Sequence, residues 1–409
     1  MGDTSEDIAE AGFKDRTRVD EAREALRAVV SKVDQTEVVD LDSADGRAIA
    51  ESVRAERPVP HYSRAAMDGY AVRAESTFGA SERSPAILRE IEEGPVGGDD
   101  AVRVHTGSEL PDGADAVVKI EDVERVGAEV EVFDAAAEGE NVGPVGEDVE
   151  ARTELYEPGH QLRPSDLGLL KSTGIGTVAV RERPRVSVIP TGEELVQSDP
   201  DPGEVIETNG LTVSNLVRRW GGEPSYRDVV TDDREALRGA VERDLDHDVV
   251  VTTGGSSVGE RDLIPDVIDE MGEVMVHGVA LKPGHPVALG VVGETPVIML
   301  PGFPVACIVN AVQFLRPAVK WAGDLRLTDP PTFPARLDRK IPSEPGIRTF
   351  ARVSLETKDG ERVAVPTRAS GSGILSSVAL ADGWIEIREG VEGLPEDDIV
   401  AVQDWEWLP

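Results

Sequence analysis

The chain has 409 residues, with 79 Asp or Glu against 42 Lys or Arg and a formal net charge of −37. Hydrophobic residues make up 39% and charged residues 30%, which is ordinary for a soluble globular protein with more than one domain. Such acidity excludes a nucleic-acid partner, because phosphate backbones bind basic surfaces. The acids are spread along the chain and only eight of the cations are lysines, which indicates a halophilic protein.

The single cysteine, Cys307, excludes an internal disulfide framework and a cysteine-based zinc site. It lies in the apolar run "LPGFPVACIVNAV", so we expect a buried, inert thiol. No stretch is long and apolar enough to span a membrane, and the N-terminus lacks the apolar region of a signal peptide. These features predict a cytoplasmic protein without a membrane partner.

The first half of the chain is predicted to contain two helices on either side of a β-rich region. Apolar residues recur at helical spacing over 18–33, and a second helix is predicted over 163–175, with Ser165 or Asp166 as its N-cap. Between about 51 and 148 the sequence changes to short β-like runs separated by Gly, Pro and Asp. Examples are "GYAVRAE", "AVRVHTG", "DAVVKIE" and "AEVEVF". This region is typical of a compact β-rich domain.

From residue 185 the predicted strands and helices alternate, which predicts a parallel, doubly wound α/β sheet. The strands are expected over 185–192, 225–233, 248–255, 274–281 and 296–302, and the helices over 209–221, 234–245, 264–271 and 305–323. After about residue 328, short strands are expected over 332–341, 348–356, 362–367 and 383–389. They predict a C-terminal β-barrel or sandwich.

Polar loops follow the predicted strands of the α/β sheet, at the edge where open parallel sheets bind ligands. They are "TGEEL" (191–195), "TDD" (231–233), "TTGGSSVGERD" (252–262) and "KPGHP" (282–286). Glycines let the backbone approach a phosphate closely, so we expect an anion site here. Glu260 and Arg261 stand where a Walker loop needs Lys and Ser or Thr, which excludes a Walker ATPase. The run "GSGILS" (371–376) lies among β-like segments, so it is discounted as a dinucleotide fingerprint.

Two carboxylates, Asp232 and Asp262, flank the glycine loop and would repel a bare phosphate. Mg²⁺ is commonly held by one or two carboxylates together with phosphate oxygens and waters, so a bound Mg²⁺ would explain both residues. The alternative, which the sequence leaves open, is that each carboxylate only caps the helix that follows it.

Several longer motifs occur in the order found in one known family. "SRAAMDGYAVR" (63–73), "HTGSELPDGADAVVKIED" (105–122), "TTGGSSVGERD", "LKPGHPVALG" and "LPGFPVA" resemble the molybdopterin molybdenumtransferases, which are the MoeA proteins and the E domain of gephyrin. The likeness covers nearly the whole chain. It implies a multidomain α/β plus β fold: a discontinuous domain I (17–50 and 149–183), a β-rich domain II (51–148), an α/β molybdopterin-binding domain III (184–326) and a C-terminal β domain IV (327–409). With the scattered acidity, it suggests a halophilic archaeal source.

The resemblance also implies an activity in molybdenum cofactor biosynthesis. Molybdate is inserted into adenylated molybdopterin, with Mg²⁺-dependent hydrolysis of the adenylate and release of AMP; nothing in the sequence separates molybdate from tungstate. The family is homodimeric, so Asp68 and Thr106 would reach the site from the other protomer. Other cofactor-biosynthesis proteins are candidate partners.

The family's functional positions transfer onto matching residues of this chain. The residues implied in the chemistry are Asp68, Thr106, Asp148, Glu194, Asp232, Asp262, Lys282, Arg352 and Ser372, with Asp232 and Asp262 as the Mg²⁺ ligands. The residues implied in substrate and phosphate binding are Thr191, Gly192, Gly254, Gly255, Ser256, Ser257, Gly259, Pro283, Gly284, Pro301 and Gly302.

Two alternatives remain beside this activity. A molybdopterin adenylyltransferase resembles the chain only over about 185–325, and a gephyrin-like scaffold without catalysis would have lost the charged site residues, which are all present. Four positions depart from common family residues, namely Gly278, His285, Phe303 and Ala306. Because two of these departures remove lysines, the positive charge for the oxyanion is expected to depend on Lys282 and Arg352.

Overall fold

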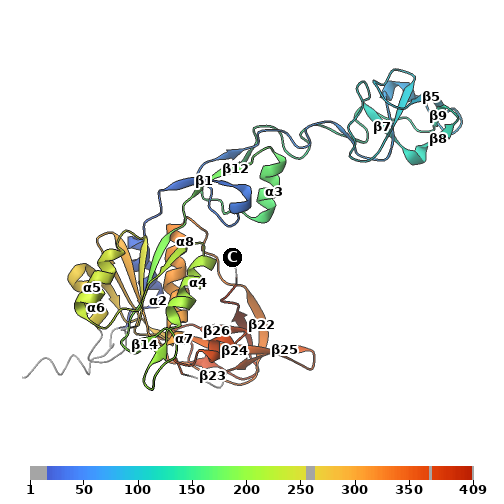
Figure 1. Ribbon diagram of the computed structural model, residues 1–409. Helices are drawn as coiled ribbons and strands as arrows, with labels where there is room; N and C mark the ends of the chain where they lie inside the picture. The colour runs from blue at the N-terminus through green and yellow to red at the C-terminus, as the bar shows by residue number, and fades with distance from the viewer. Residues whose placement is uncertain (1–15, 255–262, 368–370, 408–409) are drawn as a thin grey trace, which may run out of the picture. The chain divides into compact units, whose positions relative to one another are not determined.

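The computed structural model describes residues 16–254, 263–367 and 371–407 (Figure 1). Two compact units divide the chain: one contains the residues up to Glu37 together with those from Arg181 onward, and the other is Val38–Val180. Each unit has its own sheets and hydrophobic cores. The expected multidomain α/β plus β fold class is confirmed.

The unit Val38–Val180 contains a six-stranded sheet in the order β7-β4-β6-β5-β9-β8. Its strands are β4 (Gly69–Val72), β5 (Ala86–Ile91), β6 (Asp100–Val104), β7 (Ala116–Lys119), β8 (Val123–Val126) and β9 (Glu129–Val132). Apolar side chains are buried on both faces of this sheet, in two separate clusters. A side chain at Gly69 would overlap the carbonyl oxygen of Val118, so the close pairing of β4 with β7 requires glycine there.

Short strand pairs, one α-helix and three 3₁₀-helices make up the rest of this unit. The 3₁₀-helices are η1 (Leu41–Ser43), η2 (Ala74–Thr77) and η3 (Ile120–Asp122). The pairs are β1 (Thr36–Asp40) with β12 (Thr177–Arg181), β2 (Val53–Arg54) with β11 (Glu154–Tyr156), and β3 (Arg64–Ala65) with β10 (Val142–Gly143). Helix α3 (Pro164–Ser172) has Arg163 at its N-cap, so the expected cap at Ser165 or Asp166 was wrong. Asp166 instead accepts a hydrogen bond from the Arg163 backbone N–H (2.9 Å) from inside the first turn, because Pro164 starts the helix earlier.

The α/β sheet of the other unit has the order β16-β13-β17-β21-β20-β18. Its strands are β13 (Arg185–Pro190), β16 (Glu223–Tyr226), β17 (Val249–Thr253), β18 (Glu273–His277), β20 (Ala288–Val292) and β21 (Thr295–Leu300). The first four strands in the sheet are parallel, as expected, whereas β20 runs antiparallel to both of its neighbours, β21 and β18. The sequence analysis missed β20. Only two residues, Gly293 and Glu294, join it to β21, and so short a connection permits only a hairpin.

Helices cover both faces of the α/β sheet (Figure 1). Helices α5 (Arg234–Arg243) and α6 (Leu263–Met271) pack on one face, and α2 (Val19–Val29), α4 (Asn209–Arg219), α7 (Pro304–Asn310) and α8 (Arg316–Ala322) pack on the other. A π-helical turn, η4 (Ala311–Leu315), joins α7 to α8, so the single helix expected over 305–323 is continuous but locally widened.

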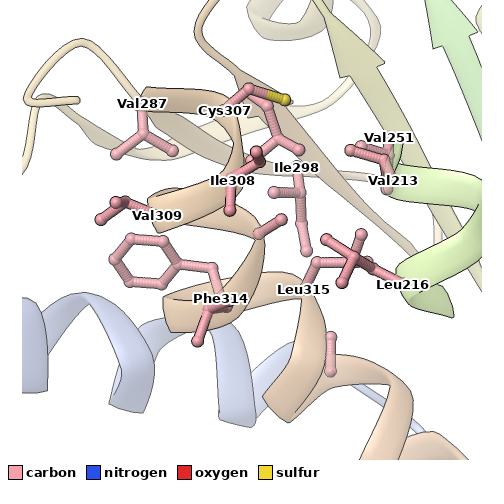
Figure 2. Packing of buried hydrophobic residues seen from close by; sticks show 14 of the residues in the cluster. Val213, Leu216, Val251, Val287, Ile298, Cys307, Ile308, Val309, Phe314 and Leu315 are labelled. Atoms are coloured by element: carbon pink, nitrogen blue, oxygen red, sulfur yellow. The ribbon is translucent and has the colours of Figure 1, made fainter. Parts of the chain in front are cut away.

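The larger core cluster joins these helices to the sheet, as Figure 2 shows for side chains of α4, β17, β21, α7 and η4. Cys307 lies in this cluster and is fully buried. Burial raises the pKa of its thiol, so the thiolate does not form at neutral pH. The expected inert thiol is confirmed.

The C-terminal strands close into a five-stranded barrel in the order β24-β25-β22-β28-β26, with β26 pairing back to β24. Its strands are β22 (Thr332–Leu337), β24 (Arg348–Lys358), β25 (Glu361–Pro366), β26 (Gly383–Ile387) and β28 (Ile399–Gln403). Three smaller elements accompany them: the pair β23 (Ile341–Pro342) and β27 (Gly393–Leu394), and the short helix α9 (Ser376–Ala379).

A two-residue strand, β19 (Leu281–Lys282), runs parallel to β24 at Arg348 and Thr349. It lies within the segment expected to form the α/β domain, yet its hydrogen bonds belong to the C-terminal sheet. Lys282 is therefore positioned by the barrel. Among the described residues, no helix has the length and apolar character needed to cross a membrane.

Candidate active site

A cavity of about 1590 Å³ opens where the carboxyl ends of the parallel strands face the barrel. Ten of the predicted site residues line it: Glu194, Asp232, Gly254, Lys282, Pro283, Gly284, Pro301, Gly302, Arg352 and Ser372. They come from segments far apart in the sequence, so the fold assembles one site from the polar loops. Five other predicted residues, Gly255, Ser256, Ser257, Gly259 and Asp262, lie outside the described residues.

The start of the glycine loop is fixed by its contact with the neighbouring strand end. Thr191 donates its backbone N–H to the carbonyl of Thr253 (3.0 Å), where β17 ends. Gly254 then takes a φ of +122°, and a side chain there would overlap the carbonyl oxygen of Thr191. Thr191 is buried, and neither it nor Gly192 lines the cavity. Thr191 supports the turn from behind, while the Gly254 backbone faces the cavity. Gly192 instead donates its N–H to the carbonyl of Val230 (3.1 Å).

In the polar loop after residue 230, two adjacent aspartates have different roles: one caps a helix and the other lines the cavity. Asp233 is the N-cap of α5 and accepts hydrogen bonds from the N–H groups of Glu235 (3.1 Å) and Ala236 (2.9 Å). Asp232 is therefore not needed as the cap, and it lines the cavity together with Glu194. Burial raises the pKa of Asp232, and the nearby Glu194 raises it further.

This crowding of carboxylates fits a divalent cation, because a cation between like charges removes their repulsion. Within residues 16–254, 263–367 and 371–407, no three His, Cys, Asp or Glu side chains are grouped as a complete metal site. Mg²⁺ needs only one or two protein carboxylates when substrate phosphates and water supply the remaining ligands. Asp232 and Glu194 therefore suit a cation that arrives with a phosphate substrate.

The loop after β19 is held rigidly beneath the cavity. Gly284 has a φ of +111°, and its carbonyl accepts a hydrogen bond from Asn310 Nδ2 (2.9 Å). The same amide nitrogen also donates to the carbonyl of Ala306 (2.8 Å), which ties the loop to helix α7. A side chain at Gly284 would overlap the Asn310 amide, so glycine is required at this position.

The two predicted oxyanion-binding cations have different surroundings. Lys282 Nζ donates to Glu344 Oε1 (2.7 Å), and both side chains are 60% exposed. Arg352 lines the same cavity but is only 7% exposed, and burial lowers the pKa of its guanidinium. The neighbouring Arg348 is paired with Asp20 and Glu389, so its charge is already compensated. Arg352 is the more desolvated of the two predicted cations.

The loop between β21 and α7 connects the α/β side of the cavity to the barrel side. The carbonyl of Gly302 accepts a hydrogen bond from Asn209 Nδ2 (2.7 Å), at the start of α4. Two residues past Phe303, the N–H of Val305 donates to the carbonyl of Ser372 (3.0 Å). The second bond places Ser372 of the C-terminal segment beside the loop between β21 and α7.

The sequence analysis missed several residues of the cavity lining. Arg339 and Lys340, at the end of the expected strand 332–341, line it on the barrel side, and Glu204 and Glu207 line it on the other. Lys340 carried a usable signal, because it is one of only eight lysines in an acidic chain. Glu207 gave none, since its carboxylate is buried and accepts hydrogen bonds from Gly210 N–H (2.6 Å) and the Tyr226 hydroxyl.

Three further predicted residues belong to the unit Val38–Val180. Asp68 Oδ1 accepts hydrogen bonds from the backbone N–H (2.7 Å) and hydroxyl (2.9 Å) of Thr106. These bonds hold the pKa of the Asp68 carboxyl below its usual value, and both residues are exposed. Asp148 is also exposed, and its N–H donates to the carbonyl of Val59 (2.9 Å). The structure thus joins Asp68 to Thr106 within one unit.

Comparison with known proteins covers most of the chain. Residues 17–174 match the MoeA N-terminal region (domains I and II), 187–321 match the probable molybdopterin binding domain, and 334–405 match the MoeA C-terminal region (domain IV). The molybdopterin molybdenumtransferase of Bacillus subtilis is 30% identical over 94% of this chain and 95% of its own. Molybdopterin molybdenumtransferase 2 of Mycobacterium tuberculosis is 33% identical over 86% of this chain and 91% of its own.

Solved structures give the same result for the fold. Two crystal structures of the molybdopterin biosynthesis MoeA protein from Pyrococcus horikoshii match with TM-scores of 0.80. They are 36% and 31% identical to this chain, and each match covers 95% of this chain and 99% of the other.

Proposed function

Because the chain belongs to the MoeA family of molybdopterin molybdenumtransferases, we propose that its cavity joins molybdate to adenylated molybdopterin while the adenylate is hydrolysed. The chain is a transferase of molybdenum cofactor biosynthesis. In the proposed reaction the dithiolene of the pterin receives the metal, water cleaves the phosphoanhydride, and AMP leaves. Tungstate is an alternative oxyanion substrate.

The observation that carries this proposal is that carboxylates and cations line opposite parts of one cavity. Asp232 and Glu194 lie beside the Gly254 turn, where phosphates would bind, and Lys282 and Arg352 lie on the barrel side. The volume of about 1590 Å³ exceeds the roughly 300–1,000 Å³ of common small-molecule pockets. A ligand that combines a nucleotide with a pterin would use that extra space.

Each part of the cavity has a separate proposed role. Asp232, with Asp262 of the glycine loop, would hold Mg²⁺, which neutralises the phosphates when bound. The backbone of Gly254 and the following loop would hold the phosphates through N–H groups. Lys282, Arg352 and Ser372 would hold the tetrahedral oxyanion through charge and hydrogen-bond donors.

The test uses the purified chain with adenylated molybdopterin, Mg²⁺ and either molybdate or tungstate. We expect AMP release that requires the oxyanion, together with metal retained on the pterin. ATP-dependent adenylation of molybdopterin would instead identify an adenylyltransferase. Unchanged adenylated molybdopterin under every condition would favour a scaffold without catalysis.

We further propose a homodimer in which Asp68 and Thr106 of one protomer complete the cavity of the partner. The proposal is supported by the family membership and by the hydrogen bonds between these two exposed residues. Asp68→Ala and Asp232→Ala proteins, each inactive alone, are expected to regain part of the activity when subunits exchange. Absence of recovery after verified exchange would place Asp68 outside the partner's site.

The net charge of −37 supports a protein adapted to the salt-rich cytoplasm of a halophilic archaeon. Repulsion between surface carboxylates is poorly screened at low salt, since the Debye length is about 30 Å at 0.01 M and about 3 Å at 1 M. The melting temperature is therefore expected to fall as KCl is withdrawn. A melting temperature that stays constant from molar to millimolar KCl would contradict this adaptation.

A further inference from the structure

Phe303 is an exposed aromatic residue inside the cavity. Its side chain is 59% exposed, although aromatic residues make up only 4% of this chain. An aromatic ring left in water forgoes the burial that usually stabilises it, and this ring is placed on the wall of a binding cavity. The position therefore favours a role in binding.

Two more exposed apolar side chains line the same cavity close to this loop. Val205 is 54% exposed and Ile206 is 45% exposed, and both belong to β15 (Val205–Ile206). Asn209, three residues after Ile206, donates to the carbonyl of Gly302, so the two segments are joined directly beside Phe303. Together Phe303, Val205 and Ile206 are called the apolar shelf below.

The ring of Phe303 is supported from the C-terminal segment. A Cβ built on Gly373 would lie 3.2 Å from Phe303 Cδ1 and 3.6 Å from Cε1, so the ring rests against a residue that has no side chain. The carbonyl of Phe303 accepts the N–H of Cys307 (2.8 Å) in the first turn of α7. Backbone and ring are thus held from two sides while the remaining ring surface faces the cavity.

We propose that the apolar shelf stacks a flat heteroaromatic ring of the substrate, with Phe303 as the stacking residue. This inference rests on the proposed function, whose substrate contains two such rings, a purine and a pterin. The loop that carries Phe303 lies between the Gly254 turn and Ser372 of the proposed oxyanion site. A Cβ on Gly302 would be 3.4 Å from Gly254 Cα, and the N–H of Val305 donates to the carbonyl of Ser372. Stacking here would hold the ring while the charged groups on either side hold phosphate and oxyanion.

The test measures binding of AMP with Mg²⁺, and separately of 6-hydroxymethylpterin, to the full chain by titration calorimetry. Phe303→Ala should weaken binding of the probe whose ring stacks on Phe303 by about tenfold, which corresponds to about 1.4 kcal/mol. Phe303→Trp should retain that binding, because it keeps a flat aromatic surface. The control is Phe333→Ala, an exposed aromatic residue of the barrel that does not line the cavity and should leave both affinities unchanged.

The outcomes separate the two rings and the two proposals. Weakened AMP binding alone identifies the purine as the stacked ring, weakened pterin binding alone identifies the pterin, and loss of both shows that the shelf accepts either. Phe303→Ala with wild-type affinity for both probes, or Phe303→Trp as weak as Phe303→Ala, would overturn the inference. A wild-type chain that binds neither probe would instead contradict the proposed function.

Discussion

The two walls of the cavity carry opposite charge. Acids line the side formed by the α/β domain, which contributes Glu194, Glu204, Glu207 and Asp232, and cations line the barrel side, which contributes Lys282, Arg339, Lys340 and Arg352. The chain as a whole has almost two acids for each cation, so a cationic wall is not what its average composition would give. Under the proposed function, this difference would let the cavity separate the parts of its ligand by charge, with the phosphates and their cation on the acidic wall and the oxyanion on the cationic wall.

Lys282 shows how the fold produces this separation. In the sequence it follows a strand of the α/β region, but β19 pairs with β24, so the lysine is presented by the barrel. The acidic wall follows the ends of parallel strands, and its Asp232 is available because Asp233 caps α5. The pairing of β19 with β24 therefore places a positive charge on the barrel wall, and the cap at Asp233 leaves a negative charge on the α/β wall.

The largest expected effect comes from Arg352, the buried cation of the barrel wall. Charge–charge attraction is stronger in a less solvated site, and a charge-assisted hydrogen bond contributes about 1.5–3 kcal/mol. Arg352→Gln should raise the molybdate concentration needed for AMP release by up to about a hundredfold, which is about 2.7 kcal/mol of binding free energy. Arg352→Lys should lose less, because it keeps the charge.

The matched control for Arg352 is Arg362→Gln on the same barrel. Arg362 is exposed, contacts the ring of Phe333 and does not line the cavity, so its loss should leave the molybdate dependence unchanged. Equal effects of both glutamine variants would mean that the barrel's overall charge, and not its cavity wall, attracts the oxyanion.

The acidic wall is tested by two neighbouring aspartates with different roles. Asp232→Asn should raise the Mg²⁺ concentration needed for AMP release by roughly tenfold, or about 1.4 kcal/mol. Asp233→Ala removes the helix cap and should lower the free energy of unfolding by about 1 kcal/mol, which lowers the melting temperature. The Mg²⁺ concentration needed for AMP release should stay unchanged. If the two variants exchanged these results, Asp232 would have a structural role and would not be an Mg²⁺ ligand.

The pH dependence of the acidic wall follows from the raised pKa of Asp232. A carboxyl whose pKa is raised on folding stabilises the fold at low pH, and that contribution is lost as pH rises through the unfolded and then the folded pKa. Asp232→Asn should therefore not lower the melting temperature at neutral pH. In the wild-type protein, the Mg²⁺ requirement should increase as pH falls toward this raised pKa, whereas Asp232→Asn should show no such increase.

Lys282 is the exposed member of the cationic wall, and its effect should be smaller than that of Arg352. Lys282→Met keeps the length of the side chain and removes its charge, so molybdate binding should weaken by about tenfold, near 1.4 kcal/mol. Binding of AMP with Mg²⁺ should change less, because the Gly254 backbone belongs to the opposite wall. If Lys282→Met bound molybdate as tightly as the wild-type protein, the oxyanion would be bound by Arg352, Arg339 and Lys340 instead.

Much of this arrangement could be predicted because it depends on local patterns. The spacing of apolar residues predicted the helices that begin near 209, 234 and 264. The grouping of the polar loops was predicted because parallel strands present their carboxyl ends at one edge of the sheet. Lys282 was expected at the site because it begins the polar loop 282–286 and matches a functional position of the family. Such signals are visible within a few residues of the chain.

The remaining features depend on contacts between distant segments. The pairing of β19 with β24 joins residues more than sixty positions apart, and no local pattern in "LKPGHP" indicates it. The Glu207 carboxylate accepts a hydrogen bond from the hydroxyl of Tyr226, 19 positions further along the chain. The contact of Phe303 with Gly373 joins a loop to the C-terminal segment. The ion pair between Lys282 and Glu344 is of the same kind. The contacts made with β24, Glu344 and Gly373 exist only after the C-terminal segment has packed against the α/β domain.

The smallest expected effect has the opposite sign and concerns Glu344. This carboxylate pairs with Lys282 across 2.7 Å, with both side chains 60% exposed, and it competes with any oxyanion for the ammonium group. Exposed pairs of this kind contribute less than about 1 kcal/mol, so Glu344→Gln should cost little stability and tighten molybdate binding by at most about fivefold. Glu396→Gln, an equal charge change on an exposed barrel residue outside the cavity, should leave molybdate binding unchanged. Weaker binding in Glu344→Gln would mean that the glutamate positions Lys282 for the oxyanion and does not compete with it.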